Sequence, residues 1–109
     1  MPSGTSEKAA FALKLFRHKL QPHFAKEEKM LAMTTHIHET IDSLTAEILN
    51  EHIQLAKMFE ALDKEIITED ELDSLGLALD QHIRKEERQL FPLIQQHCSE
   101  ELLNSFHLA

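Results

Sequence analysis

The chain has 109 residues, which suits a single domain whose core needs no disulfide. Its formal net charge of −8 argues against a nucleic-acid or anionic-membrane partner, because both require a basic face. The single cysteine cannot form an internal disulfide, which indicates a cytoplasmic protein, and no segment has the form of a signal peptide or a membrane span. Frequent Ala, Leu, Glu, Lys and Gln, with only two glycines, predict an all-α fold.

The first expected helix runs from about residue 6 to residue 33, after a frayed start at residues 1–5. Ser6 is its candidate N-cap, so the helix is expected to begin at Glu7. Apolar residues then recur at helical spacing, as at Phe16 and Phe24. Pro22 lies inside this pattern and predicts a kink, because proline lacks the N–H that a helix interior uses.

Three further helices are expected, at about 39–66, 69–97 and 100–107. Thr68 and Glu71 have the spacing of a capping box at the start of the third helix, and Ser99 is the candidate cap of the short last one. Long helices with short connections predict an up-and-down bundle, here as one domain over residues 1–109.

The most informative motif is an internal repeat. The stretch HFAKEEKML, which begins at His23, returns as HIRKEERQL at His82. In each copy the histidine precedes a glutamate, Glu27 or Glu86, by four positions, so the two side chains share one helix face. Both pairs fall in apolar rows that contain no Lys or Arg, where a carboxylate is unfavourable unless it is paired or binds a metal.

The second helix contributes His52 at the centre of its own apolar row. The resulting candidate metal ligands are three imidazoles and two carboxylates: His23, Glu27, His52, His82 and Glu86. Mixed nitrogen and oxygen ligands suit iron, manganese or zinc, and the absence of core cysteine argues against a soft-metal site. The alternative reading is a pair of solvated, charged helix faces. We expect Glu28 and Glu87 to rotate away from the ligand row and Glu51 to lie on a wetter face than His52.

At these residues the chain resembles the hemerythrin-like family, also called HHE cation-binding domains. The resemblance covers roughly residues 10–97 and rests on the two H-x-x-x-E-E copies, on Leu90-Phe91-Pro92 and on Asn50-Glu51-His52. It implies an up-and-down four-helix bundle with a di-iron centre. In that centre His23 and His82 would each ligate one iron, Glu27 and Glu86 would bridge, and His52 would add a nitrogen.

The chain departs from the family pattern in two places. The family's first helix, which carries another histidine ligand, has no clear counterpart upstream of residue 10, and Ala56 stands where oxygen carriers have a second histidine on the third helix. The missing ligand is expected from a histidine of a partner chain, from water, or from His18 if the chain reverses near Pro22.

The expected function is therefore to bind, store or sense iron, dioxygen or nitric oxide, with two iron ions per complete site and zinc or manganese as alternative metals. A di-iron oxidase or peroxidase-like enzyme and a metal-free helical interaction module are the alternatives, and the sequence favours a binding protein over an enzyme. Three long helices in place of four would leave an apolar groove, so a homodimer is expected.

Overall fold

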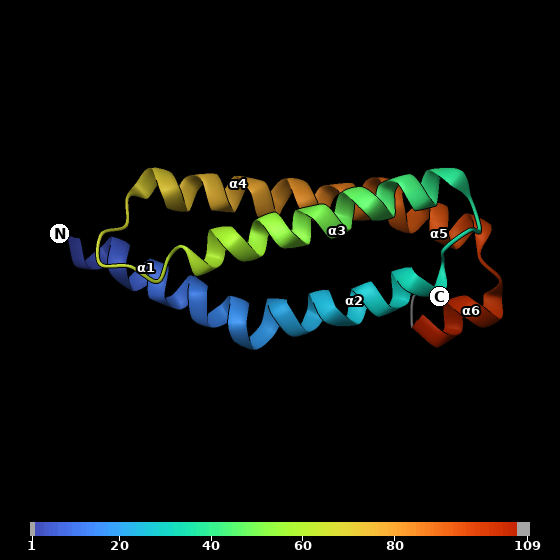
Figure 1. The fold of residues 1–109 in the computed structure, drawn as a ribbon, viewed down its shortest axis with the longest axis horizontal. Helices are drawn as coiled ribbons and strands as arrows, with labels where there is room; N and C mark the ends of the chain where they lie inside the picture. Colours follow the sequence, from blue (N-terminus) through green and yellow to red (C-terminus); the bar gives the residue numbers. More distant parts are fainter. Residues whose placement is uncertain (1, 107–109) are drawn as a thin grey trace.

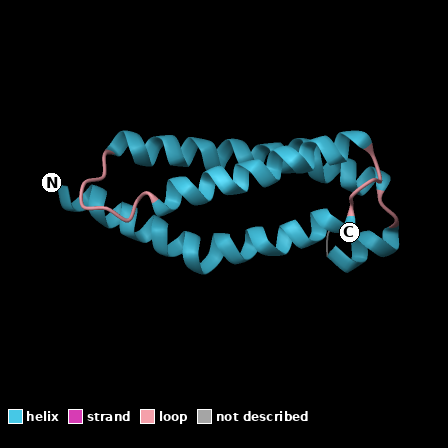
Figure 2. Cartoon of the chain, in the orientation of Figure 1, coloured by secondary structure: helices cyan, strands magenta, loops and turns pink. Residues whose placement is uncertain are grey.

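Three long helical runs lie side by side along the molecule in the computed structural model, which describes the backbone of residues 2–106 and the side chains of residues 4–105 (Figure 1). Within residues 2–106 the secondary structure is helical, without strands, as the sequence predicts (Figure 2). The elements in chain order are α1 (Pro2–Leu15), η1 (Phe16–Leu20), α2 (Gln21–Met33), α3 (Glu39–Glu60), α4 (Glu69–Lys85), η2 (Glu86–Leu90), α5 (Phe91–His97) and α6 (Glu100–Phe106).

The first run, α1–η1–α2, is helical from Pro2, so the expected frayed start and the Ser6 cap are wrong for residues 2–6. A reason lies in contacts with the rest of the bundle: Thr5 donates a hydrogen bond to Glu69 at the start of α4, and Ala9 is buried in the core. These tertiary contacts extend the helix beyond the point at which the local cap would begin it.

Pro22 does not break the first run. The chain stays helical on both sides of it and passes through a widened π-helical turn, η1, in which the Gln21 N–H donates to the Phe16 carbonyl five residues back. A second such turn, η2, precedes Pro92 in the same way. A wide turn makes room for a ring that cannot donate and that crowds the preceding turn. The expected alternative, a reversal at Pro22 that brings His18 to the site, is therefore wrong.

The second run, α3, ends at Glu60 rather than near residue 66. After Glu60 the chain turns so that Leu62 is buried and Ile67 packs against the same apolar cluster, while Ile66 stays 78% exposed. Arg17 of η1 holds the end of α3 with two hydrogen bonds to the Glu60 carboxylate, at 3.1 and 2.6 Å.

The capping predictions for the remaining helices are confirmed. Thr68 and Glu71 form the reciprocal bonds of a capping box at the start of α4. The Ser99 hydroxyl accepts from the Leu102 N–H at 3.2 Å at the start of α6. Figure 1 shows α6 beside the end of α2, which agrees with the packing of Leu103 in one core cluster with Leu31. Residue 107, the expected end of this helix, lies outside the described residues.

The core consists of two apolar clusters with polar residues between them. The first cluster comprises Ala9, Phe16, Phe24, Leu55, Phe59, Leu62 and Leu75, and the second comprises Leu31, Ile41, Leu44, Ile48, Leu90, Ile94 and Leu103. Along each long run the residues that separate the two clusters are buried and ionisable: Glu27 on the first, His52 on the second, and His82 and Glu86 on the third. The fold thus places a polar layer at mid-height of the bundle.

None of the helices within residues 2–106 combines the length and the apolar character that a membrane-spanning segment needs.

Truncation of Ile48 tests the second cluster. Ile48 is fully buried on α3, so Ile48→Ala should lower the free energy of unfolding by about 2–5 kcal/mol through lost burial and the cavity left behind. Ile66, in the turn after α3, is 78% exposed, and Ile66→Ala should change the free energy by no more than about 0.5 kcal/mol. Urea denaturation followed by circular dichroism measures both. Equal effects of the two substitutions would contradict the assigned core.

Candidate metal centre

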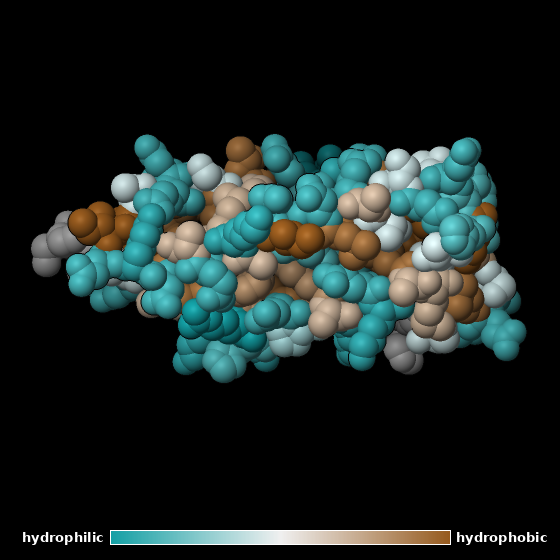
Figure 3. Space-filling model, in the orientation of Figure 1, coloured by the Kyte–Doolittle hydropathy of each residue, from teal (hydrophilic) through white to brown (hydrophobic). Residues whose placement is uncertain are grey.

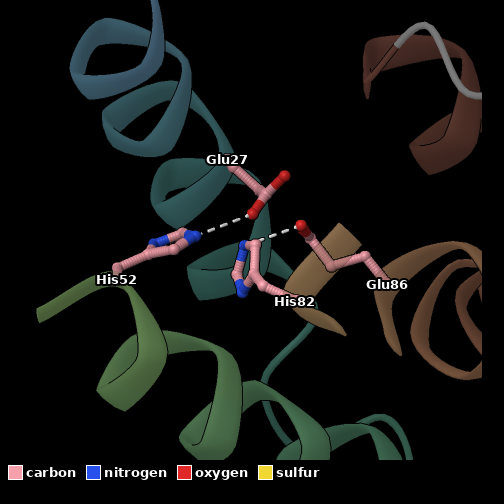
Figure 4. Close-up of side chains that lie close together, drawn as sticks. All are labelled: Glu27, His52, His82 and Glu86. Carbon is pink, nitrogen blue, oxygen red and sulfur yellow. Dashed lines mark ion pairs between the residues drawn. The ribbon is translucent and has the colours of Figure 1, made fainter. Parts of the chain in front are cut away.

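Four buried side chains from the three long runs meet between the two apolar clusters (Figure 4). Glu27 comes from α2, His52 from α3, His82 from α4 and Glu86 from the start of η2. One nitrogen or oxygen atom from each lies within 4.8 Å of the others, and each residue is at most 7% exposed. Four of the five sequence-predicted ligands thus converge.

The close contacts within the cluster are between histidine nitrogens and carboxylate oxygens. His52 Nε2 lies 3.1 Å from Glu27 Oε1, and His82 Nε2 lies 2.8 Å from Glu86 Oε1. These pairs are short, yet His52 Nε2, His82 Nε2, Glu27 Oε1 and Glu86 Oε2 make no aligned hydrogen bond within the described residues. Buried polar atoms without partners are rare and unfavourable, so this set has the donor chemistry and the unmet coordination of a metal site.

Burial and mutual repulsion give the two carboxylates opposite pKa shifts. Burial raises the pKa of Glu86 to about 7; the Glu27 carboxylate adds to this effect, and His82 opposes it. Burial also acts to raise the pKa of Glu27, but contacts with His52 and Glu86 outweigh it and hold that pKa below its usual value. Two carboxylates this close in a dry layer cannot both ionise freely, so the pair favours one shared proton or a cation.

Neighbouring carboxylates raise the pKa of each buried imidazole. For His52, burial acts to lower the pKa, but Glu27 and Glu28 outweigh it. For His82, burial acts to lower the pKa, but Glu86 and Glu51 outweigh it. The site is therefore negative in character, as a cation site should be.

A second layer of carboxylates binds the far nitrogen of each buried histidine. His52 Nδ1 lies 2.8 Å from Glu28 Oε2, and His82 Nδ1 lies 2.8 Å from Glu51 Oε1. Lys85 in turn bonds Glu51 closely and lies 3.0 Å from Glu47. A carboxylate on the far nitrogen sets the tautomer and orients the other nitrogen toward a metal.

The sequence did not predict the contacts of Glu51 with Lys85 and His82 in this layer. Glu51 lies on a wetter face than His52, as expected, with its side chain 26% exposed against 4%, but its contact with His82 on α4 was not predicted. One signal was present: Lys85 follows His82 by three residues and so lies on its side of the helix, beside α3. Glu28 lies outside the ligand cluster, as expected, and contacts the far side of His52.

Phe24 forms an apolar wall of the site. Its ring stacks on His52 at 4.1 Å between centroids and meets His82 edge-on at 5.5 Å. Phe24 also meets Phe16 of the first cluster, at 6.4 Å. The two imidazoles are thus held by hydrogen bonds on one side and by aromatic packing on the other.

His23 is the predicted ligand that the structure does not bring into the cluster. Its side chain is 63% exposed, and its Nε2 lies 3.4 Å from Glu27 Oε2. It therefore sits at the open edge of the site, next to a ligand candidate. His18 is exposed, as are His36 and His97, and His97 stacks on His38 at 4.1 Å beyond the second apolar cluster. His107 lies outside the described residues.

The hemerythrin HHE cation-binding domain matches residues 2–94 of the chain. The chain belongs to this family. Neither a curated protein nor a solved structure matches it. The all-α bundle agrees with the family, and the buried cluster of Glu27, His52, His82 and Glu86 gives a cation-binding domain its candidate site.

The raised pKa of Glu86 makes the pH dependence of folding testable in metal-free protein. Its pKa rises from 4.5 to about 7 on folding, so the folded state binds the extra proton between these values. Stability from this group is therefore present at low pH and is lost as pH rises through about 7. Glu86→Gln removes the titrating carboxyl group. The free energy of unfolding of the variant should therefore rise relative to that of the wild type as pH rises. Urea denaturation from about pH 5 to about pH 8 measures it, and a pH-independent difference would contradict the shift.

Proposed function

We propose that this protein binds a pair of iron ions at the buried cluster, and that it stores or senses iron or binds a small ligand such as dioxygen or nitric oxide. The observation that carries the proposal is the convergence of Glu27, His52, His82 and Glu86 within 4.8 Å, with four buried ligand atoms lacking hydrogen-bond partners. The membership of a cation-binding family supports it.

The donor set favours a borderline transition metal. Two imidazoles and two carboxylates suit iron, manganese or zinc better than calcium or copper(I). Glu27 and Glu86 come from different helices and lie within the same 4.8 Å cluster, so both carboxylates would hold the ions, as carboxylates do in helical di-iron bundles. His52 and His82 supply terminal nitrogens in this arrangement. Bound iron would supply a redox-active centre with affinity for diatomic ligands.

His23 completes the proposed ligand set. Its ring lies at the solvent edge, 63% exposed and 3.4 Å from Glu27, so it can rotate toward a metal without repacking the core. Phe24 lines another part of the site, and the two apolar clusters enclose it from either side along the bundle. A small ligand would therefore enter from the side of His23, and this open edge favours binding over a deeply enclosed reaction chamber.

Anaerobic titration with ferrous iron tests the proposal. We expect saturable uptake of about two ions per chain, followed on oxidation by the near-ultraviolet absorption of an oxo-bridged pair. Uptake of one ion would mean a mononuclear site. The absence of saturable uptake of iron, zinc or manganese would sink the proposal and leave a helical interaction module.

Matched variants connect this uptake to the cluster. Glu27→Ala and Glu86→Ala should each abolish binding of the ion pair, because each removes a bridging carboxylate, while the helical content survives. Removal of a buried carboxylate also removes its desolvation penalty, so the apo variants need not lose stability. Glu87→Ala, next to Glu86 but exposed, is the control and should bind as the wild type does.

We also propose that the chain forms a homodimer through its exposed apolar side chains. Large apolar side chains are exposed on each long run, among them Phe11 at 69%, Ile53 at 55% and Leu77 at 59%. Figure 3 shows apolar residues interrupting the hydrophilic surface along the middle of one face. Exposed apolar surface of this kind marks interfaces, and two-fold pairing is the commonest solution.

Sedimentation equilibrium at micromolar concentration tests the pairing. A dimer is expected in the metal-loaded protein. A strict monomer that still binds two ions would rule out a partner's contribution to the site and would leave the iron proposal intact.

A further inference from the structure

The two buried histidines, His52 and His82, differ in the groups that support the carboxylate at Nδ1. His82 Nδ1 contacts Glu51, which is held by Lys85, and Lys85 also reaches Glu47 at 3.0 Å. This chain of contacts runs from a side chain that is 1% exposed to one that is 52% exposed. Lys85 and Glu51 are themselves largely shielded, at 24% and 26%. Their ion pair is therefore screened less than one at the surface.

His52 has a carboxylate but no cation behind it. Glu28 contacts His52 Nδ1 at the same 2.8 Å, but its side chain is 45% exposed. In the part of the chain that the structure describes, no lysine or arginine pairs with Glu28. A carboxylate with this exposure is free to turn into water, and it then no longer orients the imidazole.

A comparison of the two copies of the internal repeat shows that one lysine accounts for this difference. Lys26 in the first copy and Lys85 in the second precede the ligand glutamate by one position. Lys85 is buried to three-quarters and pairs with two carboxylates, whereas Lys26 is exposed and forms no ion pair with any described residue. Two lysines in equivalent places of the motif thus have different surroundings.

We infer that Lys85 is a positioning residue, which acts through Glu51 on His82 and makes the His82–Glu86 half of the site the first to take up a metal ion. The inference rests on the proposed metal-binding function. Glu51, fixed by Lys85, accepts the Nδ1–H of His82 and leaves Nε2, which lies on the side of Glu86, to bind the ion. Phe24 holds the plane of His52, but its Nδ1 partner Glu28 has no cation to fix it, so the tautomer of His52 is less strictly set and its half binds second.

The main experiment compares Lys85→Met with the matched control Lys26→Met, using Co²⁺ alone as the probe in optical and calorimetric titrations. Loss of an outer partner typically lowers metal affinity about 10- to 100-fold, and Lys85→Met should lower the affinity for the first ion by that factor. The affinity for the second ion should change less, so the two steps should merge. Lys26→Met should alter neither step. Equal weakening by both substitutions would show a general charge effect and overturn the inference.

A second readout needs no metal. At a pH high enough to deprotonate the imidazole, nitrogen-15 NMR of the metal-free wild type should show His82 as a single Nδ1–H tautomer, and Lys85→Met should give a mixture. Lys85→Arg keeps the cation and should restore the single tautomer. On addition of sub-stoichiometric Co²⁺ to the wild type, the His82 signals should broaden before those of His52. The reverse order would overturn the inference.

A double-mutant cycle shows whether Lys85 acts through Glu51. Glu51→Gln alone should lower the affinity for the first ion as Lys85→Met does. Adding Lys85→Met to it should have little further effect. Additive losses would mean that Lys85 acts by another route. If the wild type takes up no metal, the proposed function fails, whereas an unchanged His82 tautomer in Lys85→Met overturns the role of Lys85 itself. If Lys85→Met does not fold, Lys85→Gln, which also removes the cation, replaces it in the titration, the tautomer measurement and the cycle.

Discussion

The structure depends on a layer of ionisable groups buried between two apolar clusters. Removal of Glu27 and Glu86 from water would be unfavourable by several kcal/mol for each charge if they stood alone. They do not stand alone, because each lies within 3.1 Å of a buried imidazole. The apolar clusters above and below exclude water, which strengthens every interaction inside the layer. A small protein thus concentrates its least favourable burial at one height and keeps the rest of the core apolar.

The surroundings of this layer are as organised as the layer itself. Each buried histidine is bonded at Nδ1 to an outer carboxylate, while its Nε2 lies within 3.1 Å of a cluster carboxylate without an aligned hydrogen bond. Phe24 fixes the plane of His52 by stacking. All of these groups project from long helices and not from loops, so the packing of the bundle sets their geometry. The outer carboxylates are more exposed than the cluster carboxylates, at 45% for Glu28 and 26% for Glu51 against 5% for Glu27 and 7% for Glu86.

The sequence pattern predicts the buried rows well and the contacts across them poorly. On α3, Ile41, Ile48, His52 and Leu55 recur at helical spacing, and all are buried. Periodicity is a property of one helix, so one sequence can reveal it. The pairing of Glu51 with His82 is a property of two helices and depends on their rotation about their axes. That rotation is set by tertiary packing, and the letters of either helix alone do not contain it.

His23 shows the same limit from another side. The two repeat copies agree in sequence, which suggests equal roles for His23 and His82, yet His82 is buried and His23 is exposed. The neighbouring positions are inverted: Phe24 is buried, whereas Ile83 is 41% exposed. The large Phe24 ring takes the inner place on the first run, and the histidine beside it moves to the edge. A shared motif defines spacing along a helix and leaves open which side of the helix faces the core.

The widened turn η2 changes the direction in which the side chains after it point about the axis of the third run. His82, Glu86, Leu90 and Ile94 follow one another at intervals of four, and all four are buried. In an unbroken α-helix each interval of four overshoots a full turn by about 40°, so Ile94 would be rotated by about 120° from His82. The π-helical turn takes up part of this excess rotation, because it holds more residues per turn than an α-helix. Phase correction by a single wide turn thus lets one continuous helix serve both the ligand layer and the apolar cluster beyond it, whereas the same residues wound as an unbroken α-helix would turn Leu90 and Ile94 away from the core while His82 stayed in place.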